Sequence, residues 1–138
     1  MPSFGDRSQS KLDGCHKDLQ KLLNEAIKHV DFSVIEGRRS LKKQREAYAD
    51  GRSTLDGVIK KSKHQANPSL AADLLPYPAD MHGYNIWDDK IRFALFIGTI
   101  KGIALQMNIP LRVGMDWDND GSTRNHKLVD YPHVEMDT

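Results

Sequence analysis

The sequence of 138 residues has a single cysteine, few aromatic residues and no long apolar run. One cysteine, Cys15, excludes an intramolecular disulfide and every zinc site that needs several cysteine ligands. A metal ion would therefore have to bind histidines and carboxylates. The apolar runs are all shorter than the ~20 residues that span a bilayer, and the polar residues 1–11 lack the apolar stretch of a signal peptide. We expect a protein that does not insert stably into membranes.

The sequence does contain enough apolar material for one compact core. Hydrophobic residues make up 38% and charged residues 28%, which is typical of a folded soluble domain and not of a disordered chain or a coiled coil. A length of 138 residues also corresponds to one domain. We therefore expect a single domain over residues 1–138 and a monomer.

The net charge of +1 conceals an uneven distribution along the chain. Residues 1–69 carry 14 basic and 9 acidic side chains, whereas residues 70–138 carry 6 basic and 10 acidic ones. The segment from Arg38 to Arg45 holds five basic residues in eight. Such a run is a solvated helix face, an anion site or a contact with nucleic acid. The acidic half, with histidines in and just before it, has the ligands for a divalent cation.

Hydrophobic periodicity predicts helices and strands that do not alternate regularly. Helices are predicted at residues 8–30, 41–50 and 87–107, and strands at 31–36, 70–75, 111–113 and 129–136. The helix at 87–107 is the richest in apolar residues, so we expect it to be the central buried helix. This order favours a small α+β domain in which helices flank a short antiparallel sheet.

Three short clusters hold the residues that could carry chemistry, at positions 62–64, 71–74 and 130–135. Together they offer two imidazoles and a carboxylate, in His64, Asp73 and His133. Three such ligands leave a fourth position for water, which is the layout of a catalytic zinc site. Asp130 precedes His133 by three residues, and Pro132 opposes a continuous helix between them. Asp130 is therefore free to act as a base.

The order of these clusters resembles a known family. The pattern Ser-x-His, then Ala-x-Asp, then acidic-x-x-His is similar to the zinc peptidases that cut cell-wall peptides. These include D-Ala-D-Ala carboxypeptidases and dipeptidases of the vancomycin-resistance type, and phage endolysins that are L-alanyl-D-glutamate peptidases. The likeness extends to the segments 12–19, 36–44 and 111–118, so it covers nearly the whole chain.

The resemblance implies that His64, Asp73 and His133 bind zinc at the sheet. One spacing differs from the family, which usually has six residues between its histidine and aspartate, with a glycine in the middle. Here eight residues, 65 to 72, separate His64 from Asp73, and Asn67-Pro68 replaces the glycine. Asp80 and His82 are the nearest substitutes should Asp73 not reach the metal.

The resemblance also implies roles for residues around the metal. Asp130 stands where the family has its general base, and Arg39 where it has an arginine that steadies charge on the scissile carbonyl. Ser62 stands where the family has a serine that faces the substrate. Glu135 is the rival base, since it shares a strand face with His133, and Arg38 is the rival of Arg39.

A second cation site is suggested by the acidic loop before the last strand. Asp116, Asp118 and Asp120, followed by Gly121, have the spacing that opens a calcium loop. Lys127 stands where an EF-hand has its bidentate glutamate, so the loop is not an EF-hand. A weak calcium site and a solvated turn both remain open.

These observations lead to one main hypothesis for function. We expect a zinc-dependent L-alanyl-D-glutamate endopeptidase that hydrolyses the peptide stem of peptidoglycan as a phage endolysin in host lysis, with no separate cell-wall-binding domain. Without a signal peptide, it would wait in the host cytoplasm and act on the periplasmic cell wall after release. The alternative within the family is a D-Ala-D-Ala carboxypeptidase.

Two alternatives belong to other classes. A nucleic-acid-binding module or metal nuclease would use the basic segments 38–45 and 60–63, although the near-zero net charge and the lack of a recognition motif argue against a nucleic-acid partner. A non-catalytic calcium-binding domain would be built on residues 116–121.

Overall fold

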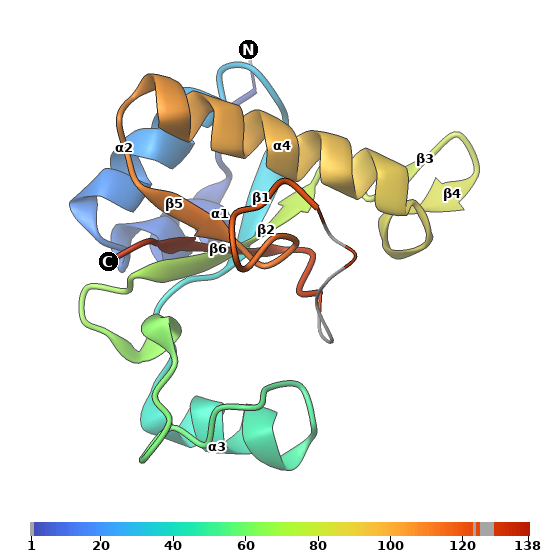
Figure 1. Cartoon of the computed structure of the whole chain (residues 1–138). Coiled ribbons are helices and arrows are strands. Elements are labelled where there is room, and N and C mark those ends of the chain that lie inside the picture. Colours follow the sequence, from blue (N-terminus) through green and yellow to red (C-terminus); the bar gives the residue numbers. More distant parts are fainter. Residues whose placement is uncertain (1, 123, 125–128) are drawn as a thin grey trace.

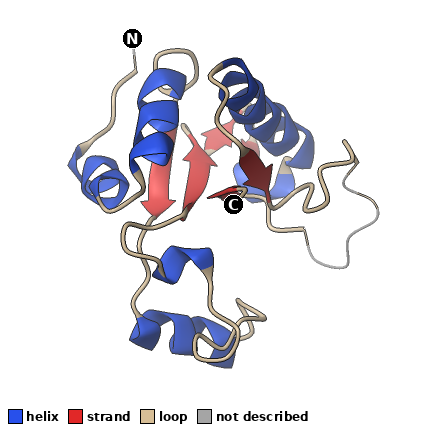
Figure 2. Ribbon diagram, turned by 60° about the vertical axis from the view of Figure 1, so that its left-hand side comes forward, coloured by secondary structure: helices blue, strands red, loops and turns tan. Residues whose placement is uncertain are grey.

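A four-stranded antiparallel sheet organises the computed structural model, which describes residues 2–122, 124 and 129–138. The sheet order is β1-β2-β6-β5, so the strands that follow one another in the chain are not all neighbours. Helices flank the sheet, which confirms the predicted α+β fold (Figures 1 and 2). The elements in chain order are α1 (Asp6–Asp13), α2 (Lys17–Ala26), β1 (Phe32–Glu36), α3 (Leu41–Ala49), η1 (Lys63–Gln65), β2 (Ala71–Pro76), β3 (Asp80–Met81), β4 (Tyr84–Asn85), η2 (Ile86–Asp88), α4 (Lys90–Gln106), β5 (Leu111–Val113) and β6 (His133–Met136).

One face of the sheet builds the hydrophobic core. Val34 is paired with Leu74, and Val134 is paired with both Ala72 and Val113, so these side chains lie on the same face. All five are buried against apolar residues of α1, α2 and α4. Apolar burial of this kind is the main force that holds the sheet and the helices together.

The opposite face of the sheet carries polar side chains. Asp73 is paired with His133 on one side and with Glu36 on the other, and Arg112 is paired with Glu135. The pairing of Glu36 depends on a register shift between Val34 and Glu36 in β1. Such a bulge turns the following side chain to the other face, so Glu36 points away from the core and toward Asp73.

The predicted helix at residues 8–30 is wrong, because two helices occupy this stretch. The chain leaves helical geometry between α1 and α2, where it runs beside Ser69. There Ser69 N–H donates to the Gly14 carbonyl at 2.9 Å, and His16 N–H donates to the Ser69 carbonyl at 2.8 Å. These long-range hydrogen bonds replace helical ones. Cys15, at the break, is buried as expected.

Two other predicted elements differ from the structure. The helix expected at 87–107 is a short 3₁₀ turn, η2, followed by α4, and its outer face leaves Ile91 and Leu95 exposed. It therefore packs on the core with only one side, and two residues of the apolar stripe expected to be buried face away from the core. The strand expected at 129–136, with an interruption at Pro132, is present only after that proline: it begins at His133, because the preceding residues form a turn that pairs with Gly114.

The segment between β1 and β2 projects from the sheet edge and carries α3 and η1 (Figure 1). Gln44, on α3, is fully buried and ties this segment together: its amide group donates to Ser53 Oγ at 2.9 Å and to the Leu55 carbonyl at 2.6 Å. Among the described residues, no helix has both the length and the apolar character needed to cross a membrane.

Candidate active site

Three ligand atoms meet on the polar face of the sheet. His64 Nε2 lies 3.2 Å from His133 Nδ1 and 3.3 Å from Asp73 Oδ1, and His133 Nδ1 lies 3.2 Å from Asp73 Oδ1. The atoms form a nearly equilateral triangle that one small cation can contact on all three corners. His64, Asp73 and His133 thus form a candidate metal site, as the sequence predicted.

Strand pairing and a short helix position the three ligands. Asp73 and His133 are direct cross-strand neighbours. His64 comes from η1, where the Ser62 hydroxyl accepts a hydrogen bond from His64 N–H at 3.2 Å and so caps the turn. The ring of His64 is fixed by a 2.7 Å hydrogen bond between its Nδ1 and the Gly37 carbonyl. That bond makes Nδ1 the protonated nitrogen and leaves Nε2 for a metal.

The longer spacing between His64 and Asp73 does not prevent them from meeting. Leu70 N–H donates to the Lys63 carbonyl at 3.1 Å, which draws the two ends of the loop together. Asp80 and His82, the alternatives considered from the sequence, lie in or beside the β3–β4 hairpin and do not belong to the cluster of convergent ligand atoms.

Glu135 holds the far side of the His133 ring. Its Oε1 lies 2.9 Å from His133 Nε2, and its Oε2 accepts from Arg112 at 2.7 Å and pairs with Lys63 at 3.0 Å. An imidazole that donates from Nε2 presents Nδ1 as its acceptor. Since Glu135 is occupied behind the ring, its position does not fit the rival role of a base at the metal.

The charges of this cluster shift the pKa values of its members. Burial alone would raise the pKa of Asp73, but hydrogen bonds from His133 and His64 lower it well below its ordinary range. Burial would lower the pKa of His133, but Asp73 and Glu135 raise it to about 9. Burial opposes ionisation of Glu135 too, yet His133, Arg112 and Lys63 lower its pKa to about 2. Without a bound cation, a protonated His133 thus balances carboxylates on both sides.

Asp130 stands beside the triangle and is more open to solvent. Its Oδ2 lies 3.9 Å from His133 Nδ1, and its side chain is 42% exposed. The backbone of Gly114 fixes it: Asp130 N–H donates to the Gly114 carbonyl at 2.9 Å, and Gly114 N–H donates to the His133 carbonyl at 2.8 Å. Burial and the nearby Asp73 carboxylate raise the pKa of Asp130. A carboxylate with a raised pKa is better suited to accept a proton.

Arg39 also reaches the site but is largely engaged by its neighbours. Its Nε and Nη2 donate to the two oxygens of Glu36, each at 2.9 Å, and its Nη1 donates to Gln44 Oε1 at 2.7 Å. Nη2 also lies 4.0 Å from Asp73 Oδ2. Three of its five N–H groups are used in this way, so two remain for another partner. Its rival Arg38 is exposed and points elsewhere.

The sequence analysis missed the residues that hold these groups in place. Glu36 and Gln44 anchor Arg39, whereas Lys63 and Arg112 anchor Glu135. Glu36 comes next to the Gly-x-Arg segment and could have been found as its partner on that ground. Gln44 lies in the same segment, 36–44, as its partner Arg39. Lys63 and Arg112 carry no local sequence signal, because their partner Glu135 lies far along the chain.

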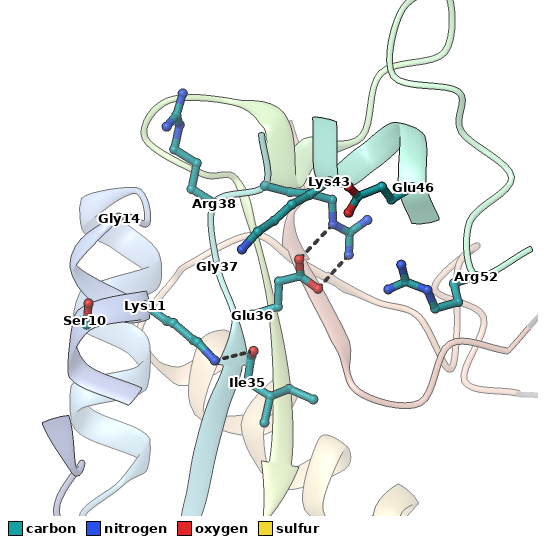
Figure 3. Close-up of a pocket in the computed structure, with 11 residues that line it drawn as sticks. Ser10, Lys11, Gly14, Ile35, Glu36, Gly37, Arg38, Lys43, Glu46 and Arg52 are labelled. Carbon is teal, nitrogen blue, oxygen red and sulfur yellow. Dashed lines mark hydrogen bonds and ion pairs between the residues drawn. The ribbon is translucent and has the colours of Figure 1, made fainter. Parts of the chain in front are cut away.

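The site opens into a cleft of about 730 Å³. Ser62, predicted to face the substrate, lies on its wall. Trp87, Trp117 and Tyr131 add aromatic surface to it. A second hollow of about 500 Å³, between α1, the end of β1 and α3, adjoins the cleft at Glu36 and Arg39 (Figure 3).

The acidic loop forms a second convergent group. Oxygen atoms of Asp116, Asp118 and Asp120 lie within 4.8 Å of one another. Lys101 Nζ approaches Asp116 Oδ2 at 3.5 Å and also contacts Asn119 Oδ1, so a positive charge already borders the group. The position of Lys127, which decided against an EF-hand, lies outside the described residues.

Comparisons with known proteins agree with this geometry. The family model of the phage L-alanyl-D-glutamate peptidases matches residues 2–136. Among solved structures, the L-Ala D-Glu endopeptidase ChiX of Serratia marcescens is similar, with a TM-score of 0.72 and 28% sequence identity over 97% of this chain and 90% of that chain. Comparison with curated proteins gives no match. With a family match over nearly its whole length, the chain belongs to the phage L-alanyl-D-glutamate peptidase family.

Proposed function

We propose that this protein is a zinc-dependent endopeptidase that cleaves the L-Ala–D-Glu bond in the peptide stem of peptidoglycan and acts as a phage endolysin. The observation that carries the proposal is the triangle of two imidazole nitrogens and one carboxylate oxygen on the floor of an open cleft. Family membership and the similarity to an L-Ala D-Glu endopeptidase support the choice of substrate.

Zinc is the metal that best fits the three ligands His64, Asp73 and His133. Bonds of about 2.0–2.1 Å at tetrahedral angles place ligand atoms about 3.3–3.4 Å apart, close to the 3.2 and 3.3 Å in this site. Calcium and magnesium prefer oxygen ligands, and two of the three atoms here are nitrogens. Three protein ligands also leave a coordination position open, as in catalytic zinc sites.

The residues around the triangle then have distinct tasks. Held by His64, Asp73 and His133, zinc would supply an activated water molecule and polarise the scissile carbonyl. Asp130 is the general base, because it is the carboxylate beside the triangle with a raised pKa and solvent access; it would take a proton from water and deliver it to the leaving amine. The N–H groups of Arg39 that Glu36 and Gln44 leave unused would stabilise negative charge that develops on the carbonyl oxygen, and Ser62 fixes the turn that carries His64.

The proposal also covers when and where the enzyme acts. We infer that it accumulates in the host cytoplasm and reaches the periplasmic wall after release. Whether it works there as a monomer stays a prediction. For the loop at Asp116, Asp118 and Asp120 we propose at most weak calcium binding, since Lys101 competes for the same oxygens. Calorimetry with CaCl₂ tests this, and an absence of binding at millimolar calcium would leave the loop as a solvated turn.

Digestion of purified Gram-negative sacculi with the zinc-loaded protein tests the main proposal. Mass spectrometry of the fragments should show new peptides that begin with D-Glu. Release of free D-Ala instead would make the enzyme a carboxypeptidase, and release of neither would refute the proposed activity.

Two variants test the roles of individual residues. Asp130→Ala should abolish turnover while zinc stays bound at one ion per chain, and loss of zinc would place Asp130 among the ligands. His133→Ala should lose both zinc and activity, so stoichiometric zinc in this variant would refute its assignment as a ligand.

A further inference from the structure

Apart from Arg39, the basic residues of segment 38–45 have no part in the mechanism above. Arg38 and Lys43 are exposed and line the second hollow together with Lys11 and Arg52; Lys43 points into it, whereas the Arg38 side chain points outward from its rim (Figure 3). Within the described residues, neither Arg38 nor Lys43 has an ion pair, whereas Arg52 is paired with Asp50 at 3.1 Å. Glu36 and Glu46 also line the hollow, but Glu36 is paired with Arg39, so among the described residues basic side chains outnumber acidic ones there.

The hollow shares part of its wall with the cleft over the candidate metal site. Glu36 and Arg39 line both, as do Ile35 and Arg52. Arg39 Nη2 lies 4.0 Å from Asp73 Oδ2, so a single guanidinium separates the metal ligands from the hollow. A peptide bound across the metal can extend one side of its chain directly into this space.

The two sides of the metal differ in charge and in chemistry. The sheet order β1-β2-β6-β5 places Asp73 and His133 on the central strands, with the hollow beyond β1. On the other side, past β5, the cleft wall has Trp117, whose ring lies 5.3 Å from that of His133. The cations there are compensated, since Arg112 and Lys63 both bind the Glu135 carboxylate. The excess of positive charge therefore lies on the β1 side.

The proposed substrate is equally asymmetric about its scissile bond. In the peptidoglycan stem, D-Glu is joined to the next residue through its side-chain carboxyl group, so its α-carboxylate stays free. The following diamino acid of a Gram-negative wall carries another free carboxylate. The opposite side of the bond is L-Ala on a lactyl group and a sugar, which carries no charge. The acidic part of the stem is thus the part that leaves with the new amine.

We propose that the hollow between α1, the end of β1 and α3 is a binding site for the free carboxylates on the leaving side of the stem peptide, with Lys43 as the cation directed into it and the exposed Arg38 as the cation at its rim. This inference rests on the proposed function and gives the substrate a direction: D-Glu and the diamino acid lie toward β1, and L-Ala lies toward β5. Charged groups of this kind act mainly by attracting and orienting the ligand. They should affect KM and its salt dependence more than kcat.

A pair of synthetic peptides separates this inference from the proposed function. One is N-acetyl-L-Ala-γ-D-Glu-diaminopimelate, and the other is the same peptide with the D-Glu α-carboxylate amidated. The zinc-loaded wild-type enzyme should cleave both, with a lower KM for the free acid, and 0.3 M NaCl should reduce the difference. If it cleaves neither peptide, the proposed function fails and the inference fails with it.

The double variant Arg38→Gln/Lys43→Gln tests the two cations. Its KM for the acid peptide should rise about tenfold, as expected for the loss of two exposed ion pairs. Its KM for the amide peptide, which keeps only the carboxylates of the diamino acid, should rise less, while kcat stays within twofold. Lys17→Gln/Lys21→Gln on α2 is the matched control, because it removes the same charge from exposed positions outside both spaces. Equal KM values for the two peptides in the wild type, or an unchanged acid preference in the double variant, would overturn the proposed binding site while leaving the peptidase activity intact.

Discussion

Replacing Glu135 by glutamine should weaken zinc binding although Glu135 touches no metal. The carboxylate is 5% exposed and holds His133 Nε2 at 2.9 Å, while Arg112 and Lys63 bind its other oxygen at 2.7 and 3.0 Å. Glutamine has the same shape and can still accept one hydrogen bond from the ring. It loses the negative charge that makes His133 Nδ1 a stronger ligand, and it leaves two cations without their carboxylate.

The expected size of this effect depends on pH. Removal of such a partner typically weakens metal binding by ~10–100-fold. The same carboxylate also helps to raise the pKa of His133 to about 9, so the wild-type site binds a proton that zinc must displace at neutral pH. Glu135→Gln lowers that pKa and reduces the competition from protons. The affinity deficit should therefore be smaller at pH 7 and reach its full size near pH 9.

Competition with a chromophoric zinc chelator at several pH values measures this deficit. Glu25→Gln on α2 is the matched control, since Glu25 also accepts from a histidine, His29, at 3.2 Å but does so on the surface. Its zinc affinity should equal that of the wild type. If Glu135→Gln binds zinc as tightly as the wild type from pH 7 to pH 9, the reasoning about the His133 ring is wrong.

Three further predictions follow from buried groups. In Gly114→Ala, the new Cβ would stand 2.9 Å from Asp130 Cβ and 3.0 Å from His133 Cβ. We therefore expect the free energy of unfolding, measured with urea, to fall by about 1–3 kcal/mol and activity to be lost. Wild-type values for both would show that the site tolerates the added methyl group. Zinc binding at pH 7 should release about one proton, because the pKa of His133 is raised to about 9, and calorimetry in buffers of different ionisation enthalpy counts it. Burial raises the pKa of Cys15 from 9.0 to about 11, so the folded state keeps a proton that the unfolded state loses. The free energy of unfolding should therefore fall by about 2–3 kcal/mol between pH 9 and pH 11, a decline that Cys15→Ala should lack.

Local pattern was enough to predict the main elements of the fold. The alternation in β1, β2 and β5 and the apolar periodicity in α2 and α4 are signals that lie within each segment. The three side chains of the candidate metal site were also predictable, because the order of their clusters along the chain resembles that of a known peptidase family. What brings them together is the antiparallel pairing of Asp73 with His133, which pattern alone does not specify.

The errors have a common physical origin in contacts between distant segments. The break between α1 and α2 depends on Ser69, whose backbone binds Gly14 and His16. The helical spacing of apolar residues continues through this break, since Cys15 lies on the apolar stripe and would be buried in one long helix or in two short ones. A local signal that fits both structures cannot distinguish them, so hydrogen bonds to a loop more than 50 residues away decide the outcome.

The bulge in β1 shows how such a contact shapes the chemistry. Without the register shift, Ile35 would lie opposite Asp73, and Glu36 would lie on the face that packs on the helices. A buried carboxylate among apolar side chains is costly, and Arg39 would lose the partner that binds it at two points. The bulge turns Glu36 toward the cleft, where it fixes Arg39 beside the metal ligands. One additional residue in a strand thereby sets both the wall of the active site and the boundary of the basic hollow beyond it.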